Sequence, residues 1–414
     1  MITLNRLKAK VEEQFFINHK LRAISGAIYR KIFYHEKNEL DNYRLQYAAK
    51  SIIAINVGHV YFLEHIREFV DSLNSDKKIA PLLIGTSKWP VKKYKIELFK
   101  FLKDRYNISY GKNYFAYPWA KFANAKALFE VAVSSYGSEL KCPKIIYAHG
   151  MAGLNFSKDY RHVRFLEKYS AVLLNGPLHK KALITAQRMY GSKLPPMFEI
   201  GYLKGDRLLK KSESFNKTQF LDQLALPHVP TIMYAPTWGE FSSTNEWLYK
   251  IIDVCESMGL NLLLRLHPIM LTGKSKWYTG GVNWGEALSK IEKTTHQVRV
   301  VLGHDLDNIM LVSDIMITDV SGMALDFMIL DRPVLFLPAP EYFRIYGSDR
   351  PEKWCRPDCE INSRSELKQE IIRAIDGNSY KCPVDKLVYN QGKSLQTMID
   401  TVKGVLENDK NAAH

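Results

Sequence analysis

The stretch from 313 to 340, SDIMITDVSGMALDFMILDRPVLFLPAP, constrains the fold of this 414-residue chain more than any other. It predicts a strand, a helix and a second strand, because the short apolar run at 315–317 is bounded in the way a buried parallel strand is. Small residues follow where that strand ends and the helix begins: Thr318, Asp319, Ser321 and Gly322. Ligands of open α/β sheets bind at this edge, and helix-start amides beside small hydroxyl groups suit a phosphate. An ordinary helix N-cap explains the same residues, so both interpretations stay open here.

Short apolar runs alternate with helical patterns along the rest of the chain, which predicts parallel, doubly wound α/β sheets. The first half is expected to place strands at 52–57, 82–84, 129–133, 145–147, 171–174 and 198–200. The second half is expected to place them at 231–234, 262–266, 299–302, 315–318 and 334–337. Helices are expected up to residue 73 and at 94–106, 246–258, 366–375 and 394–405.

A chain of this length is too long for one compact core, so we expect two domains. Residues 211–230, with their Ser, Asn, Asp and Pro content, are the most linker-like stretch. The expected boundaries are an arm at 1–48, one Rossmann-like domain at 49–210, a second at 211–385, and a C-terminal helix and tail at 386–414.

The N-terminal arm has the pattern of a basic amphipathic helix. Residues 1–34 carry seven Lys or Arg against two Glu, and their apolar residues recur at steps of three and four. Such a segment lies in a membrane interface, with its cations against anionic lipid heads, or packs on the first domain with its basic face outward.

The net charge of +15 predicts a polyanionic partner: a nucleotide or phosphorylated substrate, an anionic membrane surface or nucleic acid. We expect no nucleic acid, because the chain has no aromatic-and-basic RNA motif and no zinc finger. The five scattered cysteines argue against a disulfide framework. A zinc site at Cys355, Cys359 and Cys382 is the alternative to ordinary thiols, and we expect no metal. Without a long apolar run or a signal peptide, the chain is expected to be cytoplasmic.

Polar residues also follow other predicted strands. His149 and Gly150 follow 145–147, where the imidazole can take a proton near neutral pH and the glycine allows close approach. Thr237 and Trp238 follow 231–234, as an anion contact and a flat face for a base, or as a rigid turn beside a core side chain.

Two further pairs of polar residues lie at expected strand ends. Arg265 and His267 share one side of a strand end, which suits a diphosphate. Lys204 and Arg207 either reach a phosphate across a cleft or are surface charges paired with Asp206.

Together these segments resemble the CDP-glycerol glycerophosphotransferase family of teichoic-acid and capsule polymer synthesis. The matching motifs occur in the family's order: YAHG at 147–150, GYLKGDRL at 201–208, YAPTWGE at 234–240, RLHP at 265–268, and SDIMITDVSGMALDF through DRPVLF at 313–336. The resemblance implies a GT-B fold, with two Rossmann-like domains facing a cleft. The first domain would bind the acceptor and the second the donor nucleotide.

The resemblance also implies roles. His149 would be the general base, and His267 with Arg265 would hold the diphosphate. Thr318, Ser321 and the amides near Gly322 would cradle the donor phosphates while Asp319 orders that loop. Asp326 would reach a ribose hydroxyl, and Thr237 and Trp238 would line the donor side.

The implied reaction moves glycerol phosphate from CDP-glycerol to a hydroxyl of a polyprenyl-linked glycan, on the inner face of the cell membrane. No cofactor is implied, and a divalent metal and the oligomeric state stay open.

Two departures from the family pattern bear on the substrates. The chain continues Gly150 with MAGLNFSK at 151–158, where many members have Thr-Pro-Leu-Lys-Lys, and it has Gly322 where a second serine is common. The first affects the acceptor side and the second the donor side. The rival interpretations are a GT-B glycosyltransferase that uses a nucleotide sugar, a sugar-nucleotide epimerase, and a non-enzymatic nucleic-acid binder.

Overall fold

The computed structural model describes residues 38, 40–56, 63–85, 114–116, 124–131, 142–148, 150, 160–272, 276–302, 305–357 and 360–412. Its Cα positions divide the chain into two compact units. The first comprises Met1–Val60, Val70–Leu128 and Glu139–Cys142, and the second comprises Tyr61–Phe69, Phe129–Ser138 and Pro143–His414. The amphipathic pattern at 1–34 and the helix expected at 94–106 lie outside the described residues, and the domain boundaries drawn from the sequence stay predictions.

The first unit contains three parallel strands in the order β3-β2-β1. They are β1 (Ser51–Asn56), β2 (Ile79–Gly85) and β3 (Tyr114–Ala116). Strand β1 is followed by α2 (Leu63–Ser75), which runs across the division and whose buried residues recur at helical spacing: Leu63, Ile66, Phe69, Val70 and Leu73. The predicted order of strand, helix and strand is therefore confirmed for this part of the chain.

The second unit begins with strands in the order β4-β5-β6-β7, where β5-β6 and β6-β7 pair in parallel. The bounds are β4 (Ala127–Glu130), which runs across the division, β5 (Lys144–Tyr147), β6 (Ala171–Leu174) and β7 (Met197–Glu199). Between and after them lie η5 (Tyr160–Lys168), α5 (Pro177–Tyr190), α6 (Leu203–Ser212) and α7 (Lys217–Gln223). The linker-like stretch at 211–230 thus contains a helix, α7, which begins at an Asn216 N-cap.

A second sheet of five parallel strands follows in the same unit, in the order β10-β9-β8-β11-β12. The strands are β8 (Thr231–Tyr234), β9 (Asn261–Leu264), β10 (Val298–Val300), β11 (Ile315–Thr318) and β12 (Val334–Phe336). Strands β9 and β10 follow one another on one side of β8, and β11 and β12 follow one another on the other side. The carboxyl ends of β8 and β11 therefore form a topological switch point, where open α/β sheets bind ligands.

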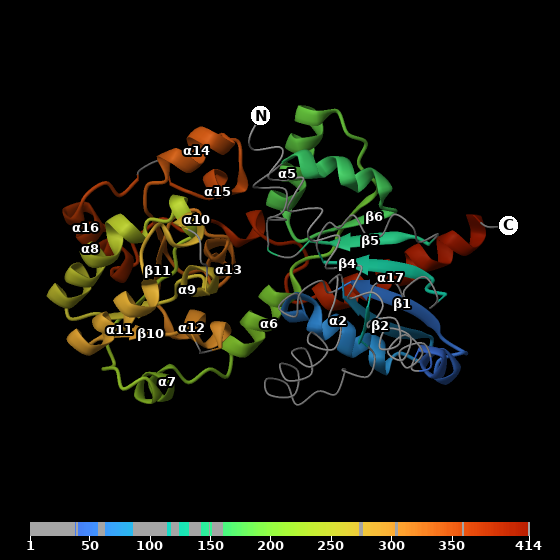
Figure 1. Ribbon diagram of the computed structural model, residues 1–414, viewed down its shortest axis with the longest axis horizontal. Coiled ribbons are helices and arrows are strands. Elements are labelled where there is room, and N and C mark those ends of the chain that lie inside the picture. Colours follow the sequence, from blue (N-terminus) through green and yellow to red (C-terminus); the bar gives the residue numbers. More distant parts are fainter. Residues whose placement is uncertain are drawn as a thin grey trace, which may run out of the picture. The chain divides into compact units, whose positions relative to one another are not determined.

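Helices cover both faces of this second sheet (Figure 1). Ile232 and Tyr234 of β8 point into a core shared with α8 (Thr244–Ser257), α11 (Trp284–Thr294) and α16 (Arg364–Ile375). Alternation along the strand sends Met233 to the opposite face, where α12 (Leu306–Val312) and α13 (Met323–Met328) contact the sheet. The remaining elements are η6 (Gly239–Phe241), α9 (Pro268–Thr272), α10 (Lys276–Thr279), α14 (Pro340–Tyr346), α15 (Pro351–Trp354), η7 (Val384–Lys386) and α17 (Ser394–Ala412).

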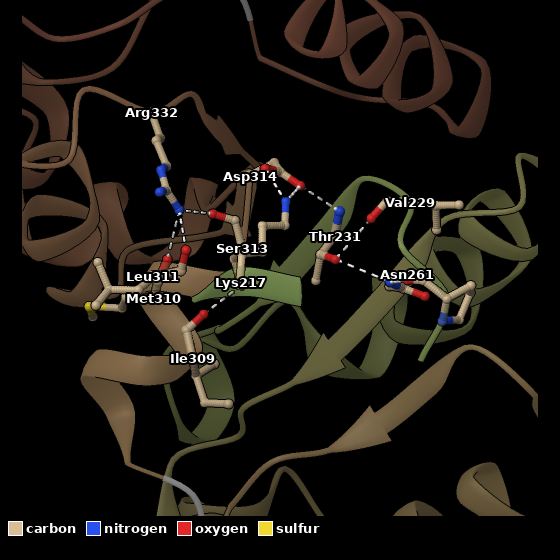
Figure 2. A network of polar contacts seen from close by, with 11 residues as sticks. Lys217, Val229, Thr231, Asn261, Ile309, Met310, Leu311, Ser313, Asp314 and Arg332 are labelled. Carbon is tan, nitrogen blue, oxygen red and sulfur yellow. Dashed lines mark hydrogen bonds and ion pairs between the residues drawn. The ribbon is translucent and has the colours of Figure 1, made fainter. Parts of the chain in front are cut away.

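A polar network fixes the amino ends of β8 and β11 (Figure 2). The Asp314 carboxylate accepts a hydrogen bond from the Thr231 amide at 2.8 Å and contacts Lys217 Nζ at 2.5 Å. Arg332 donates to three backbone carbonyls at the end of α12, those of Met310, Leu311 and Ser313. Because these polar groups bond to one another, we assign a structural role to the amino edge of the sheet. A ligand site is therefore sought at the carboxyl edge.

The C-terminal segment packs against the turns that follow β6 and β7. The Asp206 carboxylate accepts from the amides of Gly392 (2.7 Å) and Ser394 (3.0 Å), at the start of α17. Gly176 lies so close that a Cβ there would be 1.7 Å from the Leu387 carbonyl oxygen. No side chain fits at this position, so the close packing of residues 387–394 requires the glycine.

Candidate functional site

Asp319 organises the switch point of the five-stranded sheet. It directly follows β11, is fully buried, and uses both carboxylate oxygens inside the protein. One oxygen accepts from the Thr237 amide at 2.7 Å, and the other accepts from the amide and the hydroxyl of Ser243 at 2.8 and 2.9 Å. Burial raises the pKa of this carboxyl, while the hydrogen bonds from Ser243 and Thr237 oppose the shift. Asp319 therefore joins the loop after β11 to the loop after β8.

The other residues expected at the end of β11 divide into buried and accessible ones. Thr318 is fully buried and donates its hydroxyl to the Ala235 carbonyl at 2.7 Å, so it also joins the two loops. Ser321 and Gly322 are half-buried, and the Ser321 hydroxyl accepts from the Met323 amide at 3.4 Å. The pair that a ligand can reach is thus Ser321 and Gly322, which precede the six-residue helix α13.

Trp238 and His267 lie near one another, at the ends of β8 and β9. Their ring centroids are 6.2 Å apart, and the Tyr278 ring lies 5.5 Å from the Trp238 ring at a tilt of 40°. The Ile269 amide donates to His267 Nδ1 at 3.2 Å, which favours the tautomer with its proton on Nε2. The His267 side chain is exposed.

Arg265 is half-buried and takes part in the packing at the end of β10. Its guanidinium donates to the carbonyls of Val301, at 3.1 Å, and Leu302. The sequence predicts that Arg265 and His267 lie on one side of the strand end. In the structure, Arg265 bonds to the loop after β10 and His267 is exposed. Their expected contact with a diphosphate stays a prediction.

The cations of the segment after β7 bond to carboxylates of the protein. Lys204 Nζ lies 2.5 Å from Asp326 Oδ2, and the Tyr202 hydroxyl donates to Asp326 Oδ1 at 2.9 Å; all three side chains are buried. Arg207 pairs with Asp307 at 3.2 Å and with Glu68 at 3.3 Å.

The alternative that these two cations are surface charges paired with Asp206 is wrong, because Lys204 is buried against Asp326 and Arg207 pairs with Asp307 and Glu68. Asp206 bonds to two amides at the start of α17. Contact of Lys204 and Arg207 with a phosphate stays a prediction, as does contact of Asp326 with a ribose. A bound ligand would have to compete with, or add to, the ion pairs that these side chains already form.

His149 lies outside the described residues, but its neighbours Ala148 and Gly150 both form hydrogen bonds with Asn175. The Asn175 amide group donates to the Ala148 carbonyl at 3.2 Å and to the Gly150 carbonyl at 2.7 Å. Gly150 has a φ of 78°, in the region that favours glycine. Sequence reasoning missed Asn175, although it follows β6 as the other polar residues follow their strands.

The described residues contain no group of three His, Cys, Asp or Glu side chains that could hold a metal ion. Cys355 and Cys382 are buried free thiols, and the neighbouring Cys355 lowers the pKa of Cys382. Cys359, the third residue of the possible zinc set, lies outside the described part of the chain. Over that same part, no helix is both long and apolar enough to cross a bilayer.

Residues 169–347 match the family model described as CDP-glycerol:poly(glycerophosphate) glycerophosphotransferase. The matched region is 179 residues long, which is less than half of the 414-residue chain. It includes every residue singled out for the site except His149 and Gly150.

Two curated relatives to which the chain is similar are named teichoic acid poly(glycerol phosphate) polymerases. The one from Staphylococcus epidermidis is 30% identical over 173 residues, which cover 39% of this chain and 21% of the relative. The one from Bacillus spizizenii is 28% identical over 156 residues, covering 35% of this chain and 36% of the relative. The matches therefore span only about a fifth to a third of each relative's length.

Solved structures extend the likeness to most of the chain. The wall teichoic acid polymerase TagF matches with a TM-score of 0.56 and 16% identity, over 92% of this chain and 96% of that chain. A UDP-GlcNAc 2-epimerase from Methanocaldococcus jannaschii matches with a TM-score of 0.54 and 12% identity, over 86% of this chain and 99% of that chain. At such low identity these matches show the fold alone, and the expected GT-B α/β fold is confirmed.

Replacing Lys204 by methionine is expected to lower the free energy of unfolding of this protein by about 3 kcal/mol or more, because Asp326 would stay buried without its cation. Denaturant unfolding measures the change. The double variant Lys204→Met/Asp326→Leu is expected to recover much of the loss, since it removes both charges. A double variant that regains stability but no longer binds a nucleotide donor would instead favour the ligand-binding role expected from the sequence.

Replacing Asn175 by alanine is expected to lower the free energy of unfolding by about 2 kcal/mol, because the carbonyls of Ala148 and Gly150 lose a buried donor. Asn175→Asp is expected to cost more, because a carboxylate of the same shape would face two carbonyl oxygens. Thermal unfolding of the two variants tests this order. Equal stability of the wild type and Asn175→Asp would show that the amide does not hold this turn.

Proposed function

We propose that this protein transfers glycerol phosphate from CDP-glycerol, or a similar polyol phosphate from its CDP derivative, to a hydroxyl of a polyprenyl-linked glycan, in teichoic-acid-like or capsule polymer synthesis. The observation that carries the proposal is the glycerophosphotransferase match over 169–347. That region contains the loops at the switch point of the second sheet, and open α/β sheets bind ligands at such points. A structure of TagF with CDPG gives a TM-score of 0.56 against this chain and supports the same class of donor.

In the proposed reaction, the acceptor hydroxyl oxygen attacks the β-phosphorus of CDP-glycerol. A new P–O bond forms, the bond from that phosphorus to the bridging oxygen breaks, and CMP leaves with the electron pair. The proton of the hydroxyl passes to a base, for which we propose His149. Most of the barrier reduction in such phosphoryl transfers comes from positioning and electrostatic stabilisation.

We propose that His267 Nε2–H donates to the diphosphate, since Nδ1 already accepts from the Ile269 amide. Arg265 contributes positive charge from its half-buried position beside the loop after β10. Ser321 and the amides near Gly322 contact the donor phosphates, and the flat face of Trp238 lies on the donor side. No cofactor is needed, because the diphosphate itself carries the activated phosphate. Transfer measured with and without EDTA tests whether a divalent cation assists.

Nucleotide release tests the proposed donor. CDP-glycerol and UDP-sugars are offered in parallel, with a detergent-dispersed lipid-linked disaccharide as acceptor. The proposal predicts release of CMP that depends on the acceptor. Release of UDP from a sugar, with CDP-glycerol untouched, would assign the protein to the nucleotide-sugar enzymes, with which it shares its fold.

We propose further that the basic arm holds the protein on the inner, anionic face of the cell membrane. Deleting residues 1–34, which carry a net charge of +5 from seven cations and two Glu, is expected to weaken binding to anionic liposomes about tenfold or more. Co-sedimentation with anionic and with neutral vesicles measures the loss, and neutral vesicles serve as the control. Unchanged binding to anionic vesicles would place the membrane contact elsewhere.

A further inference from the structure

We infer that Arg356 is a positioning residue for the loop at 319–322, a role in donor binding that rests on the proposed function of that loop. The Arg356 side chain is completely buried. Its guanidinium donates three hydrogen bonds to backbone carbonyls: Nε to Glu352 at 3.0 Å, Nη1 to Leu337 at 3.2 Å and Nη2 to Asp319 at 2.5 Å. Nothing in the sequence pattern pointed to this residue, which lies 37 positions beyond Asp319.

Two of those acceptors are the first residues after neighbouring strands. Asp319 follows β11 and Leu337 follows β12, so one guanidinium ties together the carboxyl ends of both strands. The Asp319 side chain meanwhile bonds to Thr237 and Ser243 in the loops after β8. Arg356 therefore holds the main chain of Asp319, and the Asp319 carboxylate in turn holds the segment after β8 that contains Thr237 and Ser243.

The surroundings of Arg356 leave it little room to move. Its guanidinium carbon lies 4.7 Å from the ring centroid of Phe336 and 5.2 Å from that of Phe343. Glu360 pairs with it at 3.7 Å. Burial lowers the pKa of Arg356, and the nearby carboxylates of Asp319, Glu360 and Glu352 oppose that shift.

A planar fork with several fixed donors can serve three carbonyls at once, which an ammonium group cannot do in the same directions. Removing the guanidinium would also leave Asp319 buried without a nearby cation, and uncompensated buried charges are costly. Loops that bind charged groups contribute most when they are held in place beforehand. Arg356 thus supplies the rigidity that Ser321 and Gly322 need in order to meet a phosphate.

Arg332 is a matched control within the same sheet. It also donates to three backbone carbonyls, but those lie at the end of α12, at the amino edge of the sheet (Figure 2). Arg332→Met and Arg356→Met therefore remove comparable numbers of hydrogen bonds from opposite edges. Both are expected to lower the melting temperature, but only Arg356→Met is expected to disturb the loop at 319–322.

Amide hydrogen exchange tests the loop directly in the full-length protein. In Arg356→Met, the amides of Thr237 and Ser243, which bond to Asp319, are expected to exchange about tenfold faster or more. Arg332→Met is expected to leave their exchange near the wild-type rate, and Arg356→Lys to fall between wild type and Arg356→Met. Unchanged exchange in Arg356→Met, or equal acceleration in both methionine variants, would overturn the inference.

Titration calorimetry with CDP-glycerol then connects the loop to the donor. The dissociation constant is expected to rise about tenfold or more in Arg356→Met and to stay within about twofold in Arg332→Met. Wild-type affinity in Arg356→Met, despite faster loop exchange, would overturn the link to donor binding. If the wild type itself does not bind CDP-glycerol while Arg356→Met still loosens the loop, the proposed donor is rejected and the positioning role stands.

Discussion

Replacing His149 by alanine is expected to lower the turnover of glycerol-phosphate transfer about a hundredfold or more, because positioned general bases contribute that much to proton transfer. The expectation rests on the YAHG motif at 147–150 and on the tight hold of Asn175 on the carbonyls of Ala148 and Gly150. Steady-state CMP release measures the effect, and the melting temperature of the variant shows whether it stays folded.

His228 provides the control for this substitution. It is an exposed histidine that pairs with Asp222 at 2.8 Å, outside the candidate site. His228→Ala is expected to keep wild-type turnover. If His149→Ala also keeps near-normal turnover, another group takes the proton and the assignment of the base is wrong.

Replacing His267 by alanine is expected to lower turnover by a similar factor, about a hundredfold, for a different physical reason. Nδ1 of this imidazole accepts from the Ile269 amide, which favours a proton on Nε2, and the proposed role of Nε2–H is to donate to charge that develops on the diphosphate. Loss of one such preorganised donor typically costs about two to three orders of magnitude in rate. The Trp238 ring, whose centroid lies 6.2 Å from that of His267, limits the positions that the imidazole can take.

The substitution His267→Gln separates donation from packing. A glutamine amide can present an N–H close to where Nε2–H lies, so this variant is expected to retain more turnover than His267→Ala. Measuring turnover and the Michaelis constant for CDP-glycerol in both variants makes the comparison. Equal turnover of His267→Ala and wild type would remove this histidine from the mechanism.

The order of the secondary structure was predictable because each buried parallel strand is a short apolar run with polar residues at its carboxyl end. The run at 315–317 gave β11 within one residue, and the polar residues after it lie at the switch point of the sheet. The stretch at 211–230 was harder, because its Ser, Asn and Asp content suits both a linker and helix caps. Asn216 acts as an N-cap, which produced α7 where a linker was expected.

The partners of charged side chains were not predictable, because they join residues far apart in the chain. Lys204 and Asp326 are 122 positions apart, yet they form a buried ion pair. The nearby Asp206 was the obvious partner from local spacing, but it bonds to the segment before α17. Arg356 lay outside every motif for the same reason. The motifs indicated the polar strand ends, whereas the contacts among these side chains depend on tertiary packing.

The most direct test of the central proposal is the mass of the acceptor after incubation with CDP-glycerol and the wild-type protein. A lipid-linked disaccharide acceptor is analysed by mass spectrometry, with His149→Ala as the matched control. We expect the acceptor to gain the mass of one or more glycerol phosphate units, and to gain none with the variant. An acceptor that gains a sugar from a UDP-sugar, and nothing from CDP-glycerol, would contradict glycerophosphotransfer.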